Sequence, residues 1–190
     1  KVRNLLQFAS LAKSDWQEAV RVFYTPDFEN VMKESGNQIY LSYQGLSNLL
    51  GNQQHVDEFL VATNKKQRIE YLVSEKKIYL ENPSGVTEQS VHVFRNGWGY
   101  TRLEVLCDGE FLFVEKDVIP EDDFLGNRFT LPLFIDTTML HPGKNMGKVV
   151  LKCAHMTIEV PVTIVKRSYD KEAKAERLEY KRNIYELVSL

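Results

Sequence analysis

The sequence predicts an α+β chain in several parts, because the spacing of its apolar residues changes along the 190 residues. Apolar residues recur at helical intervals at first, at alternate positions from about Arg68, and at helical intervals again after Arg167. Hydrophobic residues make up 43% and charged residues 26% of the chain, which is typical of a folded globular domain. We therefore expect a helical segment over 1–66, a β region over 67–167, and the start of a further helix over 168–190.

The first part should form short amphipathic helices, because its apolar residues fall in separate stripes. Ser14 is placed to cap the second stripe, and Gln17 three residues later would complete a capping box. The next helix should begin at Pro26, and Gly36 and Gly51 should end the third and fourth helices. The stripes are Leu5, Phe8, Ala9, Ala12; Trp16, Ala19, Val20, Phe23; Phe28, Val31, Met32; Ile39, Tyr43, Leu46, Leu50; and Val56, Phe59, Leu60.

The β region contains stretches in which apolar and polar residues alternate, the pattern of strands with one buried face. In the longest, from Met156 to Ile164, Pro161 has no backbone donor and should lie at a sheet edge or a bulge. Turn residues at 82–85, 108–109 and 142–145 separate the stretches. About seven such strands over roughly a hundred residues predict an immunoglobulin-like antiparallel β-sandwich. The other stretches are Thr101, Leu103, Val105, Cys107; Phe129, Leu131, Leu133, Ile135; and Val149, Leu151, Cys153.

The two ends of the sequence suggest a piece of a longer protein. The chain begins with Lys1 instead of methionine. A helical stripe is still running where the sequence ends, and it comprises Tyr180, Ile184, Leu187 and Val188. We therefore expect a helical domain to follow the stripe.

Charge and hydropathy argue against nucleic acid and membrane as partners. The formal net charge is −2, so the chain lacks the basic surface that binds phosphates. The basic run over 65–68 is interpreted as the solvated edge of a linker. No stretch approaches the roughly 20 apolar residues that cross a bilayer, and no signal-peptide pattern opens the sequence.

Cysteine and histidine predict no metal site. Cys107 and Cys153 fall at inward positions of strands, which favours buried free thiols, with a single disulfide across the sandwich as the alternative. Only His155 lies close to a cysteine in sequence, and no third ligand accompanies this pair. The remaining histidines, His55, His92 and His141, are isolated. We expect no metal and no cofactor.

An acidic segment is the first place to look for calcium binding or acid catalysis, and it comprises Glu115, Asp117, Glu121, Asp122 and Asp123. The apolar stretch 118–120 interrupts it, so the alternating carboxylates of a calcium loop are missing. A solvated loop is favoured. Neither cysteine has a reactive context and no G-x-S-x-G elbow is present, so we expect no catalytic residues and no enzyme activity.

The hexapeptide 95–100, Arg-Asn-Gly-Trp-Gly-Tyr, is the most distinctive local feature. Its glycines could present Trp98 and Tyr100 as a platform that stacks on a sugar, with Asn96 and Arg95 binding the glycan hydroxyls. Alternatively, Trp98 plugs the end of the sandwich against the helical segment. We favour the second interpretation, because large aromatic side chains are usually buried.

Two resemblances accompany these patterns. The stretches 136–143, 147–151 and 158–162 resemble the closing strands of bacterial immunoglobulin-like repeats. The stretches 95–101, 122–127 and 140–145 are similar to a domain-of-unknown-function family found in large uncharacterised proteins of clostridial gut bacteria. This resemblance implies an immunoglobulin-like region within a long, largely helical bacterial protein, and it implies no known activity.

Taken together, the residues favour a non-catalytic structural or interaction module. Its expected partners are neighbouring helical domains of the same chain or of another protein. A carbohydrate-binding module that uses Trp98, Tyr100, Asn96 and Arg95 is the alternative, and the compartment stays open.

Overall fold

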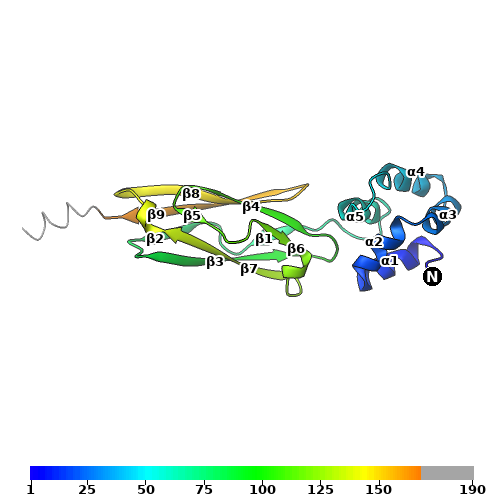
Figure 1. Cartoon of the computed structure of the whole chain (residues 1–190), viewed down its shortest axis with the longest axis horizontal. Helices are drawn as coiled ribbons and strands as arrows, with labels where there is room; N and C mark the ends of the chain where they lie inside the picture. The colour runs from blue at the N-terminus through cyan, green and yellow to red at the C-terminus, as the bar shows by residue number, and fades with distance from the viewer. Residues whose placement is uncertain (168–190) are drawn as a thin grey trace, which may run out of the picture. The chain divides into compact units, whose positions relative to one another are not determined.

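The computed structural model describes residues 1–167, which form five α-helices followed by strands in two sheets (Figure 1). The predicted helix over 168–190 lies outside the described residues. The helices are α1 (Leu5–Ser14), α2 (Trp16–Phe23), α3 (Pro26–Glu34), α4 (Asn37–Leu46) and α5 (Gln53–Ala62). The strands are β1 (Tyr71–Val73), β2 (Ile78–Glu81), β3 (Val86–Arg95), β4 (Arg102–Asp108), β5 (Leu112–Phe113), β6 (Val118–Pro120), β7 (Arg128–Asp136), β8 (Gly143–Lys152) and β9 (Thr157–Lys166).

The described chain divides into two compact units. The first unit holds the helices and three later pieces of chain, and it comprises residues 1–72, 94–102 and 120–129. The second unit holds most of the strand residues, over 73–93, 103–119 and from 130 onward. None of the helices within 1–167 is long and apolar enough to cross a membrane.

The helices of the first unit pack around a buried aromatic core, and Phe23 of α2 is at its centre. The ring centroid of Phe23 lies 5.0 Å from Tyr43, 5.4 Å from Phe59, 5.9 Å from Phe28 and 6.1 Å from Phe8. These rings come from all five helices. Each predicted apolar stripe therefore contributes a ring to one shared cluster. Tilted and edge-on aromatic pairs stabilise a core beyond the area that they bury.

The cap of α2 differs from the prediction. Asp15 is the N-cap, and its Oδ1 accepts the backbone N–H of Glu18 at 3.2 Å. Ser14 remains in α1, where its hydroxyl donates to the carbonyl oxygen of Ser10 at 3.1 Å. The predicted Ser14–Gln17 capping box was therefore wrong by one residue, because aspartate caps a helix as well as serine does and the sequence offers both side by side.

Helix α4 also ends earlier than predicted, at Leu46 instead of near Gly51. Gly45 and Ser47 flank its last residue, and both residue types have low helix propensity. Leu50, which was assigned to the helical stripe, follows the helix and is 77% exposed. The helical spacing of apolar residues continued by chance from α4 into the turn that follows it.

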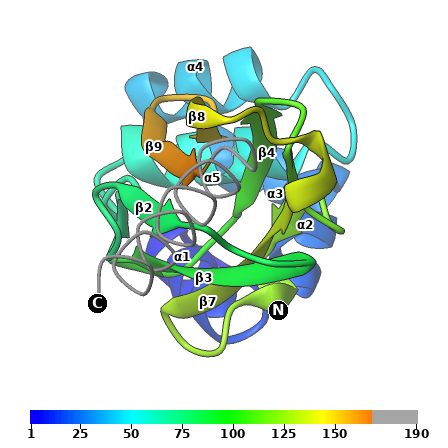
Figure 2. The ribbon, with the colours of Figure 1, turned by 90° about the vertical axis from the view of Figure 1, so that its left-hand side faces the viewer.

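The strands form a four-stranded sheet in the order β1-β3-β7-β5 and a five-stranded sheet in the order β2-β9-β8-β4-β6. Strands β3 and β7 lie in one layer, and β4, β8 and β9 lie in the other (Figure 2). Every residue of β8 pairs with β9, from Gly143 opposite Lys166 to Lys152 opposite Thr157. The predicted alternation is confirmed in β9, where Val160, Val162 and Ile164 are fully buried and the residues between them are not.

One strand pair departs from the predicted antiparallel arrangement. Strand β2 runs parallel to β9, with Ile78 opposite Val162. Strand β1 belongs to one sheet and β2, the next strand along the chain, belongs to the other, so no hairpin joins β2 to β9. Pro161 immediately precedes the residues that pair with β2, so among residues 1–167 its part of β9 has no strand neighbour on that side.

Both cysteines are free thiols and both are partly exposed, which corrects the prediction of buried side chains. Cys107 lies near the end of β4, and its partial burial raises the pKa of the thiol. Strand β8 ends at Lys152, so Cys153 lies in the turn that leads to β9. There its Sγ lies 3.6 Å from His155 Nδ1, and the imidazole is exposed. The predicted strand was one residue too long, because the structure ends β8 at Lys152.

Candidate functional site

The four residues that the sequence selects, Arg95, Asn96, Trp98 and Tyr100, lie in or beside the turn that joins β3 to β4. This turn, within residues 94–102, belongs to the first unit together with the helices. Trp98 is partly buried and packs against the aromatic core of the helices. The turn is therefore in contact with α-helical residues of its own unit.

A buried ion pair lies beneath Trp98. Asp57 is on α5, and Lys66 follows the end of that helix. The ammonium of Lys66 binds Asp57 Oδ1, and the two side chains are only 2% and 14% exposed. The same ammonium lies 5.1 Å from the centroid of the Trp98 ring, within the range of a cation–π interaction. One face of the indole is therefore occupied by a charge of the protein itself.

The end of α5 explains how Lys66 reaches this position. Asn64 adopts a left-handed conformation with φ 58° directly after the C-cap Thr63. The backbone N–H of Asn64 then donates to Val61 O at 3.1 Å, and that of Lys65 donates to Leu60 O at 2.8 Å. These two bonds form a Schellman motif, which ends a helix and turns the chain back across its own last turn. The next residue is Lys66, whose side chain lies against Asp57.

The electrostatic balance of the pair follows from its burial. Desolvation lowers the pKa of Lys66, while the carboxylate of Asp57 acts in the opposite direction and favours the charged ammonium. Asp57 Oδ1 also accepts the backbone N–H of Tyr100 at 3.3 Å. A buried carboxylate with two donors is satisfied within the protein, and it joins α5 to the turn.

Gly99 allows this close approach. Its φ is +118°, a conformation that side chains rarely adopt, and an added Cβ would collide with Asp57 Oδ1 and Lys66 Nζ. The glycine that could have exposed an aromatic platform instead lets the turn backbone lie against the ion pair.

Arg95 makes several side-chain contacts within the same unit. Its guanidinium donates to Thr101 Oγ1 at 2.9 Å, to Gly126 O at 3.2 Å and to Asn127 Oδ1 at 3.3 Å. It also lies 4.8 Å from the centroid of the Phe124 ring. The side chain thus ties β3 to the loop that precedes β7, where a planar group with several donors fits best.

Asn96 exchanges two hydrogen bonds with Glu70. Its Oδ1 accepts the backbone N–H of Glu70 at 2.9 Å, and its own N–H donates to Glu70 O at 3.2 Å. Asn96 therefore uses its polar groups to bind neighbouring backbone. The structure brings the four predicted residues together in or beside one turn, where Arg95, Asn96 and Trp98 make side-chain or ring contacts and Tyr100 donates its backbone N–H.

Comparison with known proteins places the chain in a family. The N-terminal part of the family of unknown function DUF5717 matches residues 1–190. The chain belongs to this family. The predicted membership of a family of unknown function is thereby confirmed at that level. No curated protein matches the chain.

Several solved structures show weak similarity. A FixG-related protein from Vibrio parahaemolyticus has a TM-score of 0.38 at 14% identity and covers 54% of this chain and 100% of its own. An endo-β-1,4-mannanase from Thermotoga petrophila has a TM-score of 0.29 at 17% identity, over 60% of this chain and 23% of its own. The VesB protease of Vibrio cholerae has a TM-score of 0.30 at 12% identity, over 62% of this chain and 40% of its own. Similarities at this level assign no activity.

The prediction from sequence did not select Lys66 and Asp57 as site residues. The run over 65–68 was interpreted as solvated, and this is wrong for Lys66, whose side chain is almost fully buried. A charged residue between other charged residues carries no local sign of burial. Asn64, a residue type that readily adopts the left-handed conformation after a helix, was the one signal that the chain turns back here.

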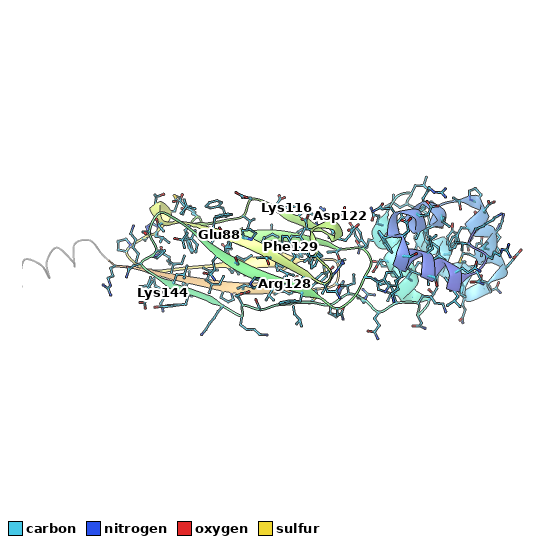
Figure 3. All side chains as sticks on the ribbon, turned by 90° about the horizontal axis from the view of Figure 1, so that it is seen from below. Glu88, Lys116, Asp122, Arg128, Phe129 and Lys144 are labelled. Carbon is cyan, nitrogen blue, oxygen red and sulfur yellow. The ribbon has the colours of Figure 1, made fainter. Side chains whose placement is uncertain are left out.

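The acidic segment shows no convergence toward a metal. Glu115, Asp117 and Asp122 are exposed, and Figure 3 labels Asp122 among the surface side chains. Over residues 1–167, no group of three histidine, cysteine or acidic side chains is placed to hold a metal ion. The interpretation as a solvated loop fits these positions.

Proposed function

We propose that this chain is a non-catalytic structural and interaction module, in which the β3–β4 turn anchors the helices of the first unit. One observation carries the proposal: Arg95, Asn96, Trp98 and the backbone of Tyr100 are engaged by contacts inside that unit. A sugar platform needs an open aromatic face and unsatisfied polar groups beside it. Here ligand binding would have to displace contacts that the fold already makes.

The proposal includes an immunoglobulin-like frame for the two sheets. The order β1-β3-β7-β5 corresponds to strands A, B, E and D of that fold, and β9-β8-β4 corresponds to G, F and C. Two features depart from the antibody pattern. Strand β3, the counterpart of strand B, contains no cysteine, so the disulfide that joins strands B and F is missing, and the pair β2–β9 is parallel. Such a frame serves as a scaffold in many unrelated proteins, so it implies no activity by itself.

The proposed partners are neighbouring helical domains of the same chain or of another protein. Apolar side chains on the outside of the helical segment over 1–66 support this, and the large ones that are more than half exposed are Leu6, Leu41, Leu49 and Leu50. Exposed apolar surface on a folded unit often marks a contact with another protein.

Hydrogen exchange of wild type and a Trp98→Ala variant tests the anchoring role. We expect faster exchange in α5 and in residues 94–102, because the alanine removes the ring that covers the ion pair, while β8 and β9 keep their protection. The control is Tyr79→Ala, which removes an aromatic side chain that is 54% exposed on β2 and should leave α5 unchanged.

The same variant separates the two interpretations of the turn. A glycan array probed with wild type and Trp98→Ala should show no retention that depends on Trp98. Unchanged exchange in α5, combined with glycan retention that is lost in Trp98→Ala, would reject the anchoring role and support a carbohydrate-binding module.

A further inference from the structure

Among residues 1–167 both sheets have open edges, and two of these edges carry a proline: that of β7 beyond β5 and that of β9 beyond β2. Strand β5 pairs with only two residues of β7, Phe134 and Ile135, and Leu125 pairs with Arg128 at the start of β7. Within residues 1–167, the intervening part of β7 over 129–133 has β3 as its single strand neighbour. Strand β2 pairs with β9 over 162–165, so residues 157–161 have β8 as their single strand neighbour in the part of the chain that the structure describes. An open edge presents backbone groups to which another strand can pair.

The direction of the β7 backbone follows from one hydrogen bond. The N–H of Asp136 donates to Phe111 O at 2.9 Å, so Asp136 directs its backbone groups toward the β5 side. Backbone groups point to alternate sides along a strand, so Phe134, Pro132 and Thr130 face the same side. At Pro132 the open edge therefore lacks its N–H donor, and the proline ring occupies that place.

Strand β9 shows the same arrangement. The N–H of Asn82 donates to Val165 O at 2.8 Å, which directs the backbone of Val165 toward the β2 side. By alternation, Thr163, Pro161 and Glu159 face that side as well. Pro161 is exposed and is the first residue beyond the pairing with β2. The backbone N–H that Pro161 lacks would therefore lie where the open edge of β9 begins.

We propose that Pro132 and Pro161 each close one open sheet edge to pairing with a second copy of this chain. In both cases a proline stands on a strand of high β-propensity, with its ring turned to the unpaired side. The residues around Pro161 are the most regular alternating segment of the sequence, from Met156 to Ile164. Such segments pair readily with identical copies unless the edge is blocked. This inference does not depend on the proposed role of the β3–β4 turn.

Sedimentation velocity of wild type, Pro132→Thr, Pro161→Thr and the double variant tests the proposal over a range of concentrations. Threonine restores the donor and favours strands. We expect roughly tenfold tighter self-association for each edge that is opened, since one restored backbone hydrogen bond changes an association constant by about that factor. The new N–H of residue 132 or 161 should exchange freely in the monomer and be protected in the associated form.

Pro142→Thr is the matched control, because Pro142 is exposed and lies outside the strands, next to β8. It should leave the association constant unchanged. Pro132→Ala and Pro161→Ala restore the donor with a smaller side chain, and they decide the outcome if a threonine variant fails to fold. Folded variants that associate no more tightly than wild type and Pro142→Thr would overturn the proposal.

Discussion

The two units of this chain build their interiors from different side chains. Phenylalanine and tyrosine rings form the centre of the helical unit, and the ring centroid of Phe23 lies within 6.1 Å of five others. Valine, leucine and isoleucine fill the strand unit, as in the fully buried Leu133 and Val162. Its aromatic pair Phe113–Phe134 stacks at 5.3 Å with Phe113 partly exposed.

The difference shows how each unit obtains its order. In the strand unit, ladders of backbone hydrogen bonds fix the register, so aliphatic residues need only alternate. Helices of eight to ten residues have no such ladder between them and are too short to be stable alone. A shared aromatic cluster has to hold the short helices together. The anchoring residues of the β3–β4 turn belong to the same unit as these helices.

Phe23→Ala should have the largest effect. Removing the central ring should cost about 3–5 kcal/mol and lower amide protection in the helices, while β8 and β9 keep theirs. Leu133→Ala is the matched change in the strand unit and should do the reverse. Hydrogen exchange monitored by NMR measures both. Equal loss of protection in both units for either variant would show that the two interiors do not behave as separate cores.

Lys66→Met should cost about 3 kcal/mol, because it leaves the Asp57 carboxylate buried without its cation. Urea unfolding measures the change. The double variant Lys66→Met/Asp57→Leu should recover much of the loss, since an apolar pair avoids desolvation of two charges. A single variant as stable as wild type would mean that the pair is solvated in solution.

Gly99→Ala tests how closely the turn approaches the ion pair. Gly36 is a suitable control, because its φ of +113° is close to the +118° of Gly99 and nothing lies within 4 Å of an added Cβ. Both substitutions carry the backbone strain of positive φ, roughly 1–2 kcal/mol. Only Gly99→Ala should add a steric cost, of about 1–2 kcal/mol. Equal thermal unfolding temperatures would indicate an open turn.

Tyr43→Phe should have the smallest effect at neutral pH. It removes the hydrogen bond from the phenol to Phe23 O, 2.8 Å long, at a cost of about 1 kcal/mol. Burial raises the pKa of Tyr43 to about 12, above its ordinary value of 10.0, so the folded state favours the neutral phenol. Its contribution is complete below pH 10.0 and is lost as the pH rises through about 12. Wild type should therefore lose stability over that window more steeply than Tyr43→Phe, as urea unfolding at each pH would reveal.

The sequence predicted the elements whose pattern is local. Alternation located β7 and β9, and helical spacing found the stripe that carries Phe23. Errors occurred at boundaries where two residues compete, such as Ser14 against Asp15 at the cap of α2.

The candidate site was predicted only in part. The hexapeptide 95–100 was selected because of its composition, and it does form one turn. Lys66 and Asp57 could not be selected, because a charge becomes a buried partner only when distant chain encloses it. Trp98 and Gly99, which enclose the pair, are about thirty or more residues away in sequence, beyond the range of periodicity or capping rules.

The central claim is that Trp98 of the turn and Lys66 beside α5 are energetically coupled within one unit. A double-mutant cycle of Lys66→Met and Trp98→Leu, measured by urea unfolding, tests it directly. We predict a coupling free energy of about 1–2 kcal/mol, because a desolvated cation lies over the indole ring. Additive effects, within about 0.5 kcal/mol, would contradict the anchoring role and leave the turn available for a ligand.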